Sequence, residues 1–135
     1  MTASARVERV RSVIEAFNEG RLDTRMMGEL FDSEVELFDF PEVPDRRLYR
    51  GLDGVKEFLA DLAENWEQTR ISIEEIRELG DAVVVLGRQS GAGALAGVPI
   101  DNSFGEVVKF EGDQIRRIRM FRDHATALEA ADAEA

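Results

Sequence analysis

The sequence contains no cysteine and only one histidine, His124. Without cysteine the chain can form neither a disulfide nor a thiolate metal site, which excludes a small secreted scaffold held together by disulfides and favours a cytoplasmic location. A metal site built on several imidazoles is not expected either, because His124 has no second histidine to join it. We therefore expect no metal ion and no other cofactor, and we interpret His124 as a surface group near the start of a terminal helix.

The sequence also lacks a long apolar run and an excess of basic residues. No uninterrupted apolar segment approaches the ~20 residues needed to cross a bilayer, so a membrane partner is not expected. Lys and Arg number 17 against 28 Asp and Glu, which gives a formal net charge of -11 at pH 7. Because nucleic-acid backbones are bound by clustered Lys and Arg, this balance argues against nucleic acid as a partner. The arginines within 116–122 would be divided between the two faces of a strand and form no continuous basic patch.

What the sequence does contain is enough apolar material for one core. It has 135 residues, 44% of them hydrophobic, and no break in composition divides it, so residues 1–135 are predicted to form a single domain. Apolar side chains first recur at helical spacing and later alternate as in strands. Helices are predicted at Ser4–Glu19, Thr24–Phe31, Leu52–Trp66 and after Asp123, and strands at Glu34–Phe40, Ile71–Glu74, Ala82–Arg88, Phe104–Phe110 and Ile115–Arg122.

This order, with helices before a run of strands, indicates an α+β fold in which helices cover one face of a twisted antiparallel sheet. The organising stretch is Ser103–Leu128, where two strands are joined by a tight turn at 111–114. Pro41–Arg50 is predicted to be a loop. The third helix is expected to place Phe58 and Leu62 in the core. Its opposite, polar face is expected to consist of Lys56, Glu57, Asp61 and Glu64.

Several segments carry a likeness to a known family. They are FNEGRLD (17–23), LFDSEVELFD (30–39), YRGLDGVKEFL (49–59), VVKFEGDQI (107–115) and MFRDHATALEAA (120–131). In this order and spacing the chain resembles the SnoaL-like branch of the nuclear transport factor 2-like superfamily. The resemblance implies a cone-shaped curved sheet, a pocket between the N-terminal helices and the concave face, and a homodimer formed through the other face. It implies no single activity, because the superfamily includes isomerases, cyclases, hydratases, epoxide hydrolases and proteins with no known chemistry.

Glu106 is the first candidate for a catalytic residue. It is the only acid inside the penultimate strand, where proteins that this chain resembles often carry one. On an apolar wall its pKa would rise, and the carboxyl group could then donate or accept a proton. The alternative is a structural ion pair with Arg119, which lies across the hairpin if Phe110 pairs with Ile115. Both interpretations stay open at this stage.

Asp39 is the second candidate. The resemblance implies that the acid that ketosteroid isomerase carries after its first strand corresponds to Asp39 or, if the alignment slips, to the inert Leu37. Cyclases of the SnoaL type resemble one another in a His and an Asp at two positions of the last strand that are occupied here by Ile118 and Met120. Val13 stands near the place of the oxyanion-binding tyrosine of the isomerases. These departures argue against transferring either mechanism.

The expected pocket is mostly apolar. Its candidate lining residues are Phe17, Tyr49, Phe58, Leu62, Trp66, Phe104, Val108, Ile118 and Met120. Trp66 has an alternative interpretation as an ordinary core residue, and Tyr49 could either stack at the pocket rim or only hold the loop before Gly51. The simple hairpin register places Phe104, Glu106 and Val108 on the face opposite Ile118 and Met120, so a bulge or a shifted pairing is required.

Three functions fit these expectations. The first is binding of a small apolar or polycyclic molecule, because such molecules are held in apolar cavities with a few placed polar groups. The second is a cofactor-independent isomerase, cyclase or hydratase that uses Glu106 and Asp39 as acid and base. The third is a non-catalytic dimeric interaction module. A dimer is expected to use the face that carries Arg117, Arg119 and Phe121.

Overall fold

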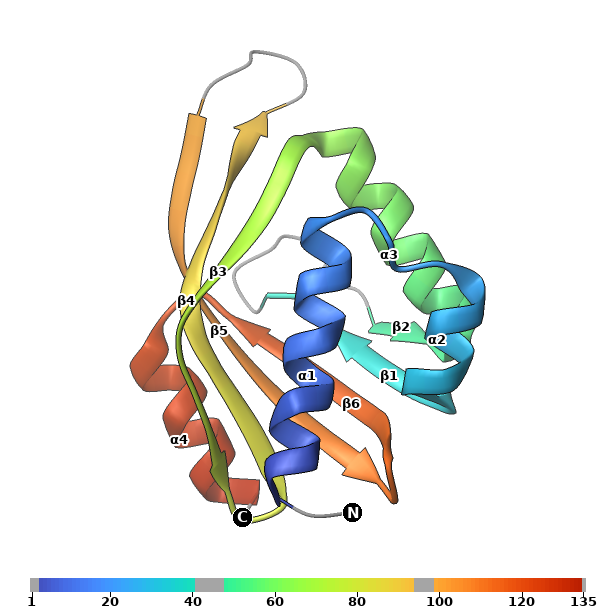
Figure 1. Ribbon diagram of the computed structural model, residues 1–135. Helices are drawn as coiled ribbons and strands as arrows, with labels where there is room; N and C mark the ends of the chain where they lie inside the picture. The colour runs from blue at the N-terminus through green and yellow to red at the C-terminus, as the bar shows by residue number, and fades with distance from the viewer. Residues whose placement is uncertain (1–2, 41–47, 94–98, 135) are drawn as a thin grey trace.

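The computed structural model describes residues 3–40, 48–93 and 99–134. Within these ranges the order of elements agrees with the α+β prediction (Figure 1). The elements are α1 (Ala3–Asn18), α2 (Thr24–Leu30), β1 (Phe31–Phe38), β2 (Leu48–Arg50), α3 (Gly51–Asn65), β3 (Trp66–Leu79), β4 (Ala82–Gly93), β5 (Pro99–Glu111), β6 (Gln114–Phe121) and α4 (His124–Glu134). No described helix is long and apolar enough to cross a membrane.

The described strands form one curved sheet in the order β2-β1-β6-β5-β4-β3. Neighbouring strands are antiparallel except for β1 and β6, which run parallel. Helices α1, α2 and α3 lie over one face of the sheet, while α4 packs on the other face against β4 and β5 (Figure 1). The prediction that N-terminal helices cover the concave face is therefore confirmed. We call this face the inner face and the face against α4 the outer face.

The strands are longer than the hydrophobic pattern indicates. β3 and β4 pair from Trp66 opposite Gly93 to Leu79 opposite Ala82, so Trp66 begins a strand and does not end the third helix. Strand pairing is made by hydrogen bonds between backbone groups. These bonds extend into polar and glycine-rich stretches, where the side chains show no hydrophobic pattern that would indicate a strand. The same reason explains why β2 was not predicted. Of the predicted loop Pro41–Arg50, residues 41–47 lie outside the described ranges. The last three residues are not loop but pair with β1.

Alternating side chains of the central strands build one core on each face. Val83 and Val85 of β4 belong to the inner core, whereas Val84 and Leu86 belong to the outer core. Gly105 allows α4 to approach the outer face closely, since a Cβ atom at this position would come within 2.7 Å of the Cβ of Ala127. The sheet is thus covered on both sides, and the inner core leaves the space described below.

The hairpin of β5 and β6 contains the irregularity that the sequence requires. Phe110 pairs with Ile115, as the simple register predicts, but Lys109 pairs with Arg117. Arg116 is therefore one extra residue in β6, a β-bulge that reverses the facing of every later side chain of the strand. The predicted bulge or shifted pairing is confirmed.

Candidate functional site

A cavity of about 480 Å³ lies between the inner face of the sheet and helices α1 and α3. Most of its lining is apolar. The predicted pocket residues that line it are Phe17, Tyr49, Phe58, Leu62, Phe104, Ile118 and Met120. Asn18 holds the end of α1 over β3: its Nδ2 donates to the Ile71 carbonyl and its Oδ1 accepts the Ile71 N–H, both at 2.8 Å.

Two of the predicted lining residues are not placed at the cavity. Val108 is 1% exposed and packs in the inner core, opposite Val83 on one side and Ile118 on the other. At this position along the strands the neighbouring side chains fill the space, so the prediction for Val108 was wrong. The side chain of Trp66 lies outside the described part of the structure.

The bulge in β6 places Met120, and not Arg119, beside Glu106 on the cavity wall. Because of the shifted register, Glu106 lies opposite Met120, and both residues line the cavity. Arg119 lies opposite Val107 on the outer face, where its guanidinium is 5.3 Å from the ring centre of Phe121. The alternative interpretation, an ion pair between Glu106 and Arg119, is therefore wrong, because the two side chains are on opposite faces of the sheet.

The environment of Glu106 favours its neutral form. Burial raises the pKa of its carboxyl group from 4.5 to about 7, since the charged form would lose its hydration. The residue is half-buried by its exposed surface and lines the cavity. Among the described residues no cation and no hydrogen-bond donor is bound to this carboxyl group. Glu106 can therefore exchange a proton near neutral pH with a molecule that enters the cavity.

Asp39 lines the same cavity, one residue beyond the end of β1. Phe38 pairs with Arg119, so the next step of the parallel ladder places Asp39 beside Met120. Glu106 and Asp39 thus lie on either side of the β6 strand, which puts their Cα atoms roughly 10 Å apart at two strand spacings. The Oδ1 atom of Asp39 accepts the N–H of Phe40 at 2.8 Å. Leu37, the alternative position, also lines the cavity.

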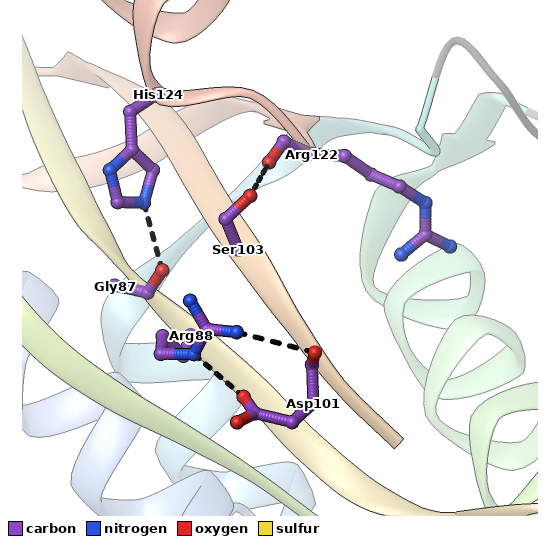
Figure 2. A network of polar contacts seen from close by, with 6 residues as sticks. All are labelled: Gly87, Arg88, Asp101, Ser103, Arg122 and His124. Carbon is purple, nitrogen blue, oxygen red and sulfur yellow. Dashed lines mark hydrogen bonds and ion pairs between the residues drawn. The ribbon is translucent and has the colours of Figure 1, made fainter.

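Arg122 is a cavity residue, although the sequence pattern indicated only that it belongs to a basic run. It follows Met120 by two positions and lines the cavity. Its guanidinium lies 4.5 Å from the ring centre of Phe40, and its Nη1 is buried without a hydrogen-bond partner among the described residues. Figure 2 shows the side chain extending away from His124, toward the side of the sheet on which α3 lies. The two-residue period through Ile118 and Met120 was the signal that could have found it.

Asp61 was predicted on the polar, outward face of the third helix, and this was wrong. It lines the cavity, and its Oδ2 accepts the hydroxyl proton of Tyr49 at 3.0 Å. The Tyr49 ring packs edge-on against Phe58 at 5.4 Å between ring centres. Asp61 lies three residues after Phe58, on the same side of the helix, and this spacing was the available signal.

Gln89 is the buried polar side chain of the described core, with 5% of its surface exposed. It lies on the inner face of β4 and lines the cavity. None of the described residues forms a hydrogen bond with its side-chain amide. Buried amides normally have a partner, so Gln89 offers a donor and an acceptor to whatever occupies the cavity.

His124 is on the outer face and takes no part in the cavity. It is half-buried at the start of α4, and its Nε2 lies 2.8 Å from the carbonyl oxygen of Gly87 (Figure 2). This contact holds α4 against β4 when Nε2 carries the proton. Among the described residues no group of three or more His, Asp or Glu side chains could hold a metal ion.

The comparisons with known proteins agree with this architecture. A family model described as a SnoaL-like domain matches residues 10–118. An NTF2-like protein of unknown function from Burkholderia pseudomallei is 21% identical over 96% of this chain and 97% of its own, with a TM-score of 0.78. An NTF2-like protein from Burkholderia thailandensis is 20% identical over 97% and 98%, with a TM-score of 0.77.

A third similar structure is a protein with a ketosteroid isomerase-like fold from Catenulispora acidiphila, solved in complex with trimethylamine. It is 16% identical over 92% of each chain, with a TM-score of 0.72. No curated protein sequence matches this chain. Likeness at these identities shows a shared fold, and the family match covers most of the sequence. The chain therefore belongs to the SnoaL-like domain family.

Proposed function

We propose that the cavity binds a small, predominantly apolar molecule and that Glu106 exchanges a proton with it. The volume of about 480 Å³ falls within the ~300–1,000 Å³ of pockets that hold small ligands. The observation that carries the proposal is the position of Glu106, an acid with a pKa of about 7 in an otherwise mostly apolar wall. Proton transfer at neutral pH is most effective for a group whose pKa lies near that pH.

A cofactor-independent isomerase, cyclase or hydratase is the second candidate. It is favoured by the presence of Glu106 and Asp39 in one cavity wall, on either side of Met120. The two carboxyl groups have different surroundings, since Asp39 accepts a backbone N–H while burial raises the pKa of Glu106. Two acids in different environments can divide the roles of proton donor and acceptor.

Ligand binding is tested with N-phenyl-1-naphthylamine, a neutral apolar dye that fluoresces strongly in apolar surroundings. We expect saturable binding with a dissociation constant in the roughly micromolar range. Leu62→Trp, which fills the cavity from α3, should abolish binding. Ala60→Trp adds the same ring on the exposed side of the same helix and should leave binding unchanged. Equal binding by both variants would show that the dye does not occupy the cavity.

Proton transfer is tested by the exchange of the carbon-bound protons of 2-tetralone in heavy water, followed by proton NMR. The ketone is small and apolar, and its protons next to the carbonyl group are acidic enough for a carboxylate to remove. We expect the protein to accelerate the exchange and Glu106→Gln to lose most of the acceleration, whereas Glu111→Gln at the exposed end of the same strand should keep it. Acceleration that is equal in both variants would contradict a role for Glu106.

Homodimerisation stays a prediction. Phe121 is 5% exposed because it packs against Ala127 and Ala131 of α4, so it is not available for a dimer contact. We propose that a dimer contact on the outer face uses the half-buried Arg117 and Arg119 instead. Light scattering during size-exclusion chromatography at micromolar concentration checks this, and a monomer mass would contradict it.

A further inference from the structure

Arg122 is the basic residue among the described residues that line the cavity. No carboxylate of the described chain lies within ion-pair distance of its guanidinium, which lies 4.5 Å from the ring centre of Phe40. Its buried Nη1 has no hydrogen-bond partner among the described residues. A charged group in such surroundings is normally paired, because burial removes its hydration.

The arginines of the outer face show the usual arrangement. Arg50 and Arg116 each lie 3.4 Å from a carboxylate oxygen of Glu36, and Arg117 lies 3.7 Å from it. These arginines are more exposed to solvent than the buried end of Arg122, yet each has a carboxylate partner. The missing partner of Arg122 is therefore a property of the cavity and not of the arginines in general.

None of the three acids of the cavity forms an ion pair with Arg122. Asp61 accepts the hydroxyl proton of Tyr49, and Asp39 accepts the N–H of Phe40. Glu106 carries only a partial charge at neutral pH, since burial raises its pKa to about 7. An anion that enters next to Arg122 would thus meet a cation that has no ion-pair partner among the described residues.

The strand register places Arg122 and Gln89 toward the same end of the cavity. Phe104 pairs with Gly87, and the following inward position of β4 is Gln89. Arg122 is the next inward position after Met120, which pairs with Glu106. Arg122 therefore lies beside Phe104, one inward position beyond Glu106. Gln89 pairs with Asn102 and lies one inward position further along the strands, on the other side of β5. At the opposite end Val108 and Ile118 close the cavity with core packing.

We propose that Arg122 binds an oxyanion of the ligand, with the Gln89 amide as a second donor, so that the ligand class is an apolar molecule with a single carboxylate or similar oxyanion. This inference rests on the proposed function and deepens it. The planar guanidinium can donate two parallel hydrogen bonds to such a group. The apolar body of the ligand would then extend along Phe17, Phe58 and Leu62, within reach of Glu106.

The test compares two dyes that share one apolar body. 8-Anilinonaphthalene-1-sulfonate carries an oxyanion, and N-phenyl-1-naphthylamine has the same rings without it. We expect Arg122→Met to weaken binding of the sulfonate dye roughly 10- to 100-fold, because it removes a charge-assisted hydrogen bond. Binding of the neutral dye should change by less than about 2-fold. Arg122→Lys keeps the positive charge but loses the planar guanidinium with its two parallel donors, so its affinity for the sulfonate dye should be intermediate.

The matched control is Arg77→Met, which removes an equal charge from an exposed ion pair with Glu75 on β3. It should leave the binding of both dyes unchanged. The assignment of Arg122 is overturned if Arg122→Met lowers the affinity for the sulfonate dye no more than Arg77→Met does. It is also overturned if Arg122→Met lowers the affinity for both dyes equally. If neither dye binds the unmodified protein, the proposed function itself fails.

A competition experiment needs no variant and stands even if Arg122→Met does not fold. The unmodified protein is loaded with N-phenyl-1-naphthylamine and titrated with 2-naphthoate or with 2-naphthamide, which differ only in the charged group. We expect the carboxylate to displace the dye at a concentration roughly 10-fold lower than the amide. Displacement at equal concentrations, or more easily by the amide, would overturn the inference while leaving the proposed cavity binding in place.

Discussion

On the outer face of the sheet, the carboxylate of Glu36 is shared by Arg50, Arg116 and Arg117 at 3.4 to 3.7 Å. On the inner face, Glu106 and Arg122 line one cavity, and among the described residues neither has an ion-pair partner. The sheet thus carries paired charges on its outer face and unpaired charges on its inner face. The outer pairs can stabilise the fold, whereas the inner groups lower its stability unless a bound molecule contacts them.

This contrast separates residues that hold the structure from residues that are available to a ligand. The unpaired groups lie where the apolar wall is interrupted, and a fold selected for stability alone would replace them by apolar side chains. Three substitutions test the contrast, two on the inner face and one on the outer face.

The largest effect is expected for Glu106→Gln. The folded-state pKa of about 7 lies above the ordinary value of 4.5, so the folded protein binds this proton more tightly than the unfolded chain. The stabilisation that this tighter proton binding gives the folded protein is fully present below pH 4.5 and is lost as the pH rises through 7. Glutamine does not ionise. At about pH 8.5 the variant should therefore be more stable than the unmodified protein, by on the order of 3 kcal/mol.

Urea denaturation at a series of pH values checks this prediction. The stability difference should shrink toward zero as the pH falls to about 4. Glu111→Gln, at the exposed end of β5, is the control and should show no comparable dependence on pH. A Glu106→Gln variant that is less stable than the unmodified protein at high pH would mean that the carboxylate has a stabilising partner.

On the outer face, Glu36→Gln should lower the stability of the folded protein, whereas Glu106→Gln should raise it. The substitution removes the carboxylate shared by three arginines, and the side chain of Glu36 is only 15% exposed. We expect a loss of about 1–2 kcal/mol in the free energy of unfolding, more than for an exposed ion pair. Glu34→Gln, at an exposed position of the same strand, should change stability by less than about 0.5 kcal/mol. Equal effects of the two substitutions would show that the outer ion pairs contribute nothing measurable.

The smallest effect is expected for Tyr49→Phe. It removes the hydroxyl that donates to Asp61 and keeps the ring packed on Phe58. The expected loss is about 1 kcal/mol, the usual net contribution of one hydrogen bond. Thermal denaturation measures it, with Tyr49→Ala as the comparison that also removes the buried ring. If the two variants were equally stable, the ring packing would have no role in holding α3 near β2.

Much of the fold could be predicted from the sequence because its signals are periodic. The apolar positions of α1 and α3 recur at helical spacing, and the turn after Phe110 contains Gly112, whose φ of 62° suits glycine. β2 could not be predicted, since three residues are too short to show a period and their strand exists only through pairing with β1. The bulge at Arg116 was required by the pattern, but two adjacent arginines give no signal of where it falls.

The candidate site was predictable where side chains are apolar and less so where they are polar. Phe17, Phe58 and Met120 could be placed at the cavity by helical or strand period. Arg122 and Asp61 were missed because charged residues are normally assigned to the surface, and only their spacing from inward neighbours indicated otherwise. The state of Glu106 depended on a one-residue register shift, which no local pattern reveals.

The measurement that tests the account most directly is a titration of the Glu106 side-chain carbonyl by carbon-13 NMR, assigned by comparison with Glu106→Gln. It is performed with the cavity empty and again with N-phenyl-1-naphthylamine bound. The account predicts a pKa of about 7 for the free protein and a higher pKa with the dye bound, because the dye displaces water and increases desolvation. A pKa near 4.5 that the dye does not change would contradict it.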